Sequence, residues 1–200
     1  MCAVLNSRHL NIGGLSFLLA DPNQHSAAII HSILRGFGAK RVIEVRNTRD
    51  AVQVLTDQKI DMMLIEPRLP DGGGFAFIYS IRQNPNNPWR TMPILVITGD
   101  ARISAIKNAR DCGANMVIAK PVSPAVLYER LAWVAFHPRR FVDTNKYFGP
   151  DRRFKIEGYG DGGGRRSADG DVTIAADEGP ALSQNEIDNL LQNARVGDPA

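Results

Sequence analysis

The stretch that most constrains the fold runs from Asp61 to Gly74 and reads DMMLIEPRLPDGGG. Its apolar run, Met62 to Ile65, has a charge before it and prolines after it. A few apolar residues between turn formers are typical of a strand buried on both faces of a parallel sheet. Glu66 follows this strand, and ligands gather outside the carboxyl ends of strands in open α/β sheets. The stretch alone leaves two interpretations open, a solvated strand end or a functional carboxylate.

The rest of the chain repeats the same alternation of buried strand and helix. Further apolar runs predict strands over 16–20, 41–45, 94–97 and 116–119, and residues at helical spacing follow each strand. Five such alternations predict an α/β fold with a doubly wound five-stranded parallel sheet and right-handed crossovers. The predicted domain covers residues 15–137, after a short lead-in at 1–14.

Composition excludes several classes of protein. The chain has 200 residues, of which 44% are hydrophobic and 22% charged, as in globular domains. No apolar run approaches the roughly 20 residues that a membrane-spanning helix needs. Cys2 and Cys112 form no disulfide framework and have no metal-ligand spacing. We therefore expect a reduced, cytoplasmic protein with no membrane segment and no DNA-binding domain.

Two segments follow the predicted domain. Residues 138–181 are rich in glycine and arginine and contain three arginine pairs, so we predict a mostly disordered linker whose aromatic residues fold back onto the domain. Residues 182–194 predict a short amphipathic helix that begins with a capping box, Ser183 with Glu186. A helix of about three turns is unstable alone in water, which indicates that it folds against a partner surface.

The residues at four strand ends are Asp21, Glu66, Thr98 and Lys120. Their spacing, with Pro121 after the lysine, resembles the receiver domain of two-component response regulators, the CheY fold, over about residues 15–137. The resemblance implies a phosphoacceptor acid at the third strand and Mg²⁺-binding acids after the first. It also implies a hydroxyl and a lysine that contact the phosphoryl group.

The chain departs from that pattern at three positions. Glu66 replaces the phosphoacceptor aspartate, and Pro22 replaces the second metal-binding acid. We therefore expect a degenerate phosphorylation site with no catalytic residue and with Mg²⁺ binding weak or absent. The extra methylene of Glu66 is expected to move its carboxylate toward Lys120. Val117 occupies the position of the family's aromatic switch residue and has no ring that could change its orientation. For Asp21, Glu66 and Lys120, two interpretations stay open: a structural ion-pair network and a domain frozen in an active-like state.

The C-terminal stretch LSQNEIDNLL resembles the N-terminal peptide of the flagellar switch protein FliM, which binds phosphorylated CheY. Capping and amphipathicity explain much of this match, but they require neither Gln184 nor Asp188. The resemblance implies that the partner is a CheY-like receiver, or a flagellar switch or chemotaxis protein, with a histidine kinase as a further candidate. The residues expected to bind the partner are Leu182, Glu186, Ile187, Asp188, Leu190 and Leu191.

These features together predict a non-enzymatic signalling adaptor of chemotaxis or flagellar control, a pseudo-receiver that engages partners through its C-terminal peptide. Two alternatives remain. One is a phosphoryl-accepting regulator with a non-standard site. The other is a cyclic di-GMP effector that uses the arginine pairs, since paired guanidinium groups bind phosphates. The sequence leaves open whether the C-terminal helix binds its own domain or another molecule.

Overall fold

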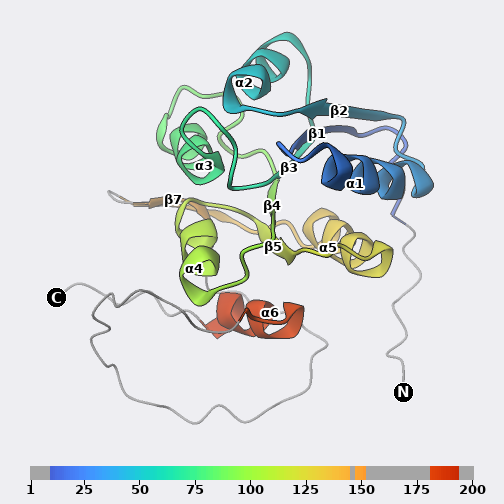
Figure 1. The fold of residues 1–200 in the computed structure, drawn as a ribbon. Coiled ribbons are helices and arrows are strands. Elements are labelled where there is room, and N and C mark those ends of the chain that lie inside the picture. The colour runs from blue at the N-terminus through green and yellow to red at the C-terminus, as the bar shows by residue number, and fades with distance from the viewer. Residues whose placement is uncertain (1–9, 145–146, 152–180, 194–200) are drawn as a thin grey trace, which may run out of the picture.

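The computed structural model describes residues 10–144, 147–151 and 181–193. Five parallel strands form one sheet in the order β2-β1-β3-β4-β5 (Figure 1). They are β1 (Ser16–Ala20), β2 (Arg41–Val45), β3 (Met62–Ile65), β4 (Ile94–Thr98) and β5 (Met116–Ala119). The predicted doubly wound five-stranded parallel sheet is therefore confirmed. The strand order reverses between β1 and β3, which places a topological switch point at their carboxyl ends.

Helices cover both faces of the sheet because successive strand residues point to opposite sides. Met62 and Leu64 pack in one buried cluster with α1 (Gln24–Gly36) and α5 (Pro124–Phe136). Met63 and Ile65 pack in the other with α2 (Thr48–Asp57), α3 (Gly74–Gln83) and α4 (Ile103–Asp111). All four residues of β3 are buried, as predicted for a strand covered on both sides.

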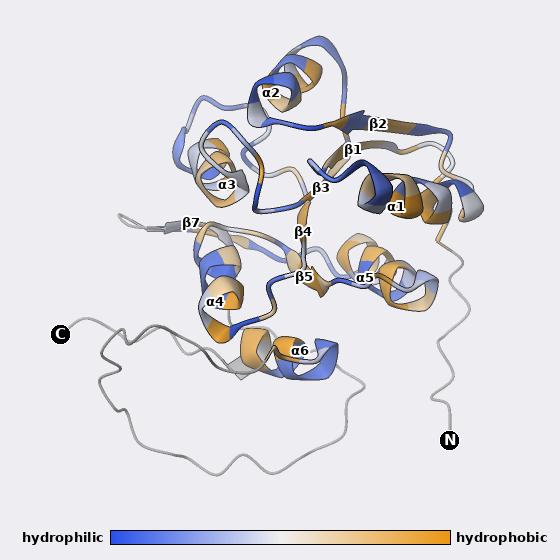
Figure 2. Cartoon of the chain, in the orientation of Figure 1, coloured by the Kyte–Doolittle hydropathy of each residue, from blue (hydrophilic) through white to orange (hydrophobic). Residues whose placement is uncertain are grey.

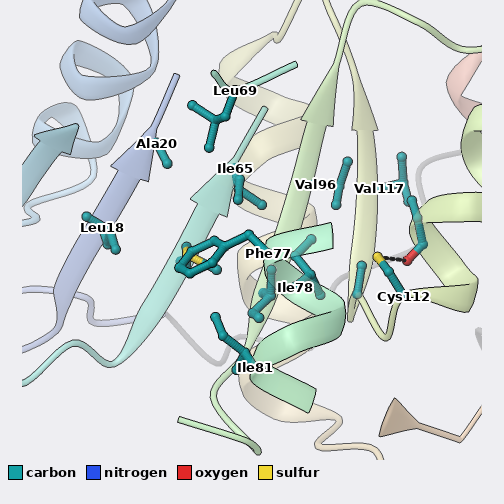
Figure 3. Close-up of a cluster of buried hydrophobic side chains, with 14 of the residues drawn as sticks. Leu18, Ala20, Ile65, Leu69, Phe77, Ile78, Ile81, Val96, Cys112 and Val117 are labelled. Carbon is teal, nitrogen blue, oxygen red and sulfur yellow. Dashed lines mark hydrogen bonds between the residues drawn. The ribbon is translucent and has the colours of Figure 1, made fainter. Parts of the chain in front are cut away.

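The second cluster supports the part of the molecule that concerns function. Phe77, Ile78 and Ile81 of α3 lie against Leu18, Ile65 and Val96 of the sheet (Figure 3). Val117 of β5 belongs to the same cluster, beside Cys112, whose thiol donates to the carbonyl of Ala109. Burial raises the pKa of the Cys112 thiol to about 12, so this cysteine is an inert core residue. The apolar faces of the helices turn toward the sheet in Figure 2.

The region after α5 contains a hairpin that was not predicted. Residues 138–181 were predicted to be mostly disordered, but β6 (Phe141–Thr144) and β7 (Tyr147–Pro150) form an antiparallel hairpin. Phe148 is buried, and the guanidinium carbon of Arg90 lies 3.4 Å from the centre of its ring. The predicted fold-back of aromatic residues is thus present here. Residues 152–180, with two of the three arginine pairs, lie outside the described part of the chain.

The predicted C-terminal helix is present as α6 (Gln184–Asn193) and lies beside α4 and β5 (Figure 1). Its predicted capping box is formed: the Ser183 backbone N–H donates to Glu186 Oε2 at 2.8 Å, and the Glu186 N–H donates to Ser183 Oγ at 3.4 Å. Among the described helices, none has the length and apolar character that crossing a membrane requires.

Candidate functional site

The four predicted strand-end residues meet at the carboxyl edge of the sheet. Asp21 follows β1, Glu66 follows β3, Thr98 ends β4 and Lys120 follows β5. Parallel strands place these ends at one edge, and the flanking prolines and glycines let the chain turn away there. Asp21, Glu66 and Thr98 are buried, at 2%, 7% and 2% exposed. Three buried polar groups and a lysine therefore share one small region.

Lys120 holds the two acids together. Its Nζ lies 2.7 Å from Asp21 Oδ2 and 2.7 Å from Glu66 Oε2. Buried charges need partners, because an unpaired carboxylate in a low-dielectric environment is costly. One ammonium thus compensates two carboxylates that would otherwise repel each other. The contact with Glu66 also shows the longer glutamate side chain reaching the lysine.

Asp21 accepts two further hydrogen bonds. Its Oδ2 accepts from Ser26 Oγ at 2.7 Å, and its Oδ1 accepts from the backbone N–H of Asn23 at 2.8 Å. Pro22, between them, has neither a backbone N–H nor a carboxylate. Asp21 therefore acts as a hydrogen-bonded anchor that joins the start of α1 to Lys120.

Thr98 reaches the edge but bonds to its own loop. Its hydroxyl accepts from the Asp100 N–H at 3.0 Å and donates to the Asp100 carbonyl at 3.4 Å. Hydrogen bonds from Arg102 hold the pKa of Asp100 at about 2, below its ordinary value of 3.8. Arg68 adds a second cation near this carboxylate, at 3.3 Å. Asp100 thus organises the loop that links β4 to α4.

The receiver resemblance implies Mg²⁺, so the donor set can be tested against it. Mg²⁺ prefers near-octahedral oxygen ligation by one or two carboxylates with several waters. Here both carboxylates face an ammonium, and Pro22 stands where the family has its second metal-binding acid. Within the described ranges, no group of three His, Cys, Asp or Glu side chains is arranged to hold a metal. These residues do not fit the ion without displacement of Lys120.

A second site lies on the face formed by α4, β5 and α5, where α6 is docked on its own domain. Ile187 is 0% exposed and Leu191 is 7% exposed, both within the cluster that contains Val117. Leu182 and Leu190 pack against the same cluster while remaining partly exposed. The apolar face of α6 is therefore buried intramolecularly, which answers the question of cis or trans binding for this structure.

Polar contacts fix the position of α6. Gln184 Oε1 accepts from the Ala119 N–H at 2.8 Å, and its Nε2 donates to the Val117 carbonyl at 3.0 Å. The Leu182 N–H donates to the Ala101 carbonyl at 2.9 Å. Gln184 was not among the residues predicted to bind the partner. The sequence did contain a signal for it, because neither helix capping nor amphipathicity requires a glutamine at this position. The switch position thus contributes its backbone carbonyl to the docking of α6.

A buried ion pair completes the docking. Arg130 of α5 donates through Nη2 to Asp188 Oδ2, and both side chains are at least nine-tenths buried. Burial raises the pKa of Asp188 above its ordinary value, against the opposing effects of Arg130 and of the hydrogen bond from Gln184. Sequence reasoning placed Asp188 in the binding surface but could not identify Arg130 as its partner, since 58 residues separate them.

The fold and the strand-end edge define a receiver-type domain, and comparison with known proteins agrees. The profile of the response regulator receiver domain family matches residues 17–132. The chain belongs to this family. The probable chemotaxis protein CheY of Rhizobium etli is 25% identical over 107 residues, which cover 54% of this chain and 81% of that protein.

Two further relatives show how widely this domain is used. The sensory/regulatory protein RpfC of Xanthomonas campestris is 23% identical over 131 residues, and this chain spans only 18% of its length. A solved receiver domain of a sensor histidine kinase from Pseudomonas aeruginosa is 30% identical, with a TM-score of 0.54. The match covers 60% of this chain and 98% of that domain, which has a magnesium ion in its active-site cleft.

Proposed function

We propose that this chain is a receiver domain that works without phosphoryl transfer, as a cytoplasmic non-enzymatic adaptor in bacterial two-component or chemotaxis signalling. The observation that carries this proposal is Lys120, at 2.7 Å from both Asp21 and Glu66. A phosphoryl donor approaching Glu66 must replace that ion pair, and Mg²⁺ must displace the ammonium from two carboxylates. Breaking the Lys120–Glu66 pair leaves a buried carboxylate without its partner before any bond to phosphorus forms.

The proposed output is α6. The sequence of α6 resembles a peptide that binds receivers. Its apolar face packs against a receiver surface, which here belongs to the same chain. Release from that surface would present Ile187, Leu190 and Leu191 to a CheY-like receiver or a flagellar switch protein. Cis binding then competes with partner binding, and the tether keeps the effective concentration of the cis helix high.

Incubation with acetyl phosphate and Mg²⁺ tests the first half of the proposal. Intact-mass measurement is expected to show no phosphoryl adduct on the wild-type protein. The rival function, a phosphoryl-accepting regulator, predicts an adduct that disappears in Glu66→Gln. Such an adduct would overturn the proposal, because it requires Glu66 to act as a nucleophile despite Lys120.

Binding to a purified CheY-like receiver tests the second half. The double variant Ile187→Asp with Leu190→Asp places two charges on the apolar face and is expected to abolish binding. Its matched control, Asn185→Asp with Asn189→Asp, adds the same charges at exposed positions of α6 and is expected to bind like the wild type. If the Ile187 and Leu190 variant binds equally well, α6 is not the output.

A further inference from the structure

A small cavity lies at the amino edge of the sheet, at the opposite ends of the strands from the candidate phosphorylation site. Its volume is about 90 Å³, and Asn115, just before β5, forms part of one wall. Trp133 and His137 at the end of α5 form another wall, with Arg139 and Phe141 of the segment that enters β6. The last four of these residues follow residue 132, where the match to the receiver family ends. This cavity is therefore built by the extension that follows the matched domain.

Asn115 brings hydrogen-bond donors to the cavity. The residue is 7% exposed, and its Oδ1 accepts from Arg82 Nη2 at 3.1 Å and from the Ile94 N–H at 2.9 Å. These two donors fix Oδ1 as the accepting end of the amide, so its NH₂ group is turned away from them. Among the described residues, no acceptor is hydrogen-bonded to that NH₂ group. A buried amide donor without a partner is costly, which favours an acceptor in the cavity.

Two buried guanidinium groups flank the aromatic walls of the cavity. The Cζ atom of Arg139 lies 5.4 Å from the centre of the Trp133 ring, and Nη1 of the same guanidinium donates to the Asp151 carbonyl at 3.3 Å. The Cζ atom of Arg82 lies 5.2 Å from the centre of the Phe141 ring. Among the described residues, Arg82 donates to neutral carbonyl and amide oxygens. Burial lowers the pKa of both guanidinium groups to about 10, so a negative charge in the cavity would stabilise both cations.

The size and the walls of the cavity limit its occupant. A cavity of about 150 Å³ holds benzene, so about 90 Å³ accommodates roughly four or five non-hydrogen atoms. Drug-sized molecules occupy pockets of about 300–1,000 Å³, which makes a nucleotide too large for this site. A planar carboxylate matches the fork of a guanidinium group, and one or two carbon atoms fit against aromatic rings. Inorganic phosphate carries more charge and has no apolar part to cover these rings.

We infer that this cavity binds a short-chain monocarboxylate, of the size of acetate or propionate. Arg139 and the NH₂ group of Asn115 hold its carboxylate, and the rings of Trp133 and Phe141 cover its carbon atoms. The occupant bridges the end of α5 and the residues that enter β6. The inference is independent of the proposed function, because the cavity shares no residue with the strand-end site or with the contacts of α6.

The test titrates sodium acetate and sodium propionate into the isotope-labelled full chain, at an ionic strength held constant with sodium chloride. The NMR signals of the Asn115 side-chain NH₂ group and of the Trp133 indole N–H are expected to shift and to saturate. The dissociation constants should be millimolar, because so small a ligand makes few contacts. The indole signal of the other tryptophan, Trp89, should not shift, since that residue does not line the cavity. Acetamide, which has the shape of acetate without its charge, should bind at least fivefold more weakly.

Two variants and a matched control separate recognition of charge from a general loss of structure. Arg139→Gln removes the cation, and Asn115→Asp replaces the NH₂ donor while keeping an acceptor for Arg82. Each is expected to weaken acetate binding at least fivefold. Arg140→Gln removes the neighbouring exposed arginine and should bind acetate as the wild type does.

Four results would overturn the inference. They are the absence of a saturating shift, equal affinities for acetate and acetamide, wild-type affinity in Arg139→Gln, and a loss of affinity in Arg140→Gln as large as in Arg139→Gln. Inorganic phosphate is titrated in the same way, and we expect it to bind at least fivefold more weakly than acetate. Phosphate binding as tight as acetate binding would refute the selectivity for carboxylates.

Discussion

Replacing Ile187 by alanine tests whether α6 is a detachable helix or an integral part of the fold. The side chain is 0% exposed and lies in the cluster shared by α4 and β5. Substitution of a buried isoleucine by alanine costs about 2–5 kcal/mol, and we take about 3 here because an edge helix can shift to fill part of the space. Each 1.4 kcal/mol is about a factor of ten in an equilibrium constant. The ratio of docked to undocked α6 should therefore fall by about 100-fold.

Hydrogen exchange of the Ala119 amide measures this ratio, since its acceptor is Gln184 Oε1 and not a strand of the sheet. We expect its protection to fall by about 100-fold in Ile187→Ala, together with that of the α6 amides. The amides of β1 and β3 should keep their protection, because they open only with the whole domain. Asn185→Ala, at an exposed position of α6, is the control and should leave the exchange of Ala119 unchanged.

Two results would refute this reasoning. Unchanged protection at Ala119 would mean that Ile187 does not hold the helix. Equal loss of protection across α6, β4 and β5, with a melting temperature lowered by several degrees, would mean that α6 unfolds only with the domain. In that second case α6 is a structural element, and an adaptor role that needs its release fails.

Three further predictions concern the rest of the domain. Pro22→Asp with Glu66→Asp restores the acids expected of the family and should produce Mg²⁺ binding by calorimetry; no heat of binding would show that Lys120 alone blocks the ion. Because Arg102 holds the pKa of Asp100 at about 2, the folded state binds that proton less tightly than the unfolded state. This stabilisation is present above about pH 4 and is lost as the pH falls toward 2. The free energy of unfolding in urea should therefore fall less over that range for Asp100→Asn than for the wild type. Equal decreases would contradict this prediction. Arg82, 0% exposed, donates to the carbonyls of Gly113, Arg90 and Met92, so Arg82→Met should cost at least about 3 kcal/mol in urea unfolding. A cost below about 1 kcal/mol would mean that water replaces the guanidinium.

The strands and the edge residues were predictable because their signals are local. Each buried strand is a short apolar run closed by turn formers, and the residue after it falls at the carboxyl edge in any parallel sheet. The order of strands then brings Asp21 and Glu66 together at the switch point. The sequence also predicted that glutamate, one methylene longer than aspartate, moves its carboxylate toward Lys120, and the two groups are in contact.

The hairpin of β6 and β7 was not predictable by the same means. Its strands are short and have no clear alternation, and its surroundings are rich in glycine and arginine. What orders it comes from elsewhere in the chain: Arg82 and Arg90 lie over the rings of Phe141 and Phe148. Cation–π contacts between residues more than 50 positions apart leave no periodic signal. Composition therefore indicated the fold-back of the aromatic residues but not the strand pairing of β6 and β7.

The sequence of α6 indicated a partner surface without identifying it. Amphipathic spacing requires only that Ile187 and its neighbours be covered, so it fits a foreign groove and an intramolecular one equally well. Gln184 and Asp188 carried the missing information, because neither is needed for a capped helix. Their partners, the edge of β5 and Arg130, become visible only when the sheet order and the position of α5 are known.

The two sites are physically connected even though Val117 has no ring to move. Thr98 is hydrogen-bonded to Asp100, and the next residue, Ala101, accepts a hydrogen bond from the Leu182 N–H at the start of α6. A displacement of this loop therefore acts directly on the segment that docks the helix, with no need for an aromatic switch. Conversely, a partner that removes α6 frees the Ala101 carbonyl and loosens the loop that holds Thr98. In the function proposed here, occupancy of the α4–β5–α5 face takes the place of phosphorylation at the edge, because the loop from Thr98 to Ala101 contacts both sites.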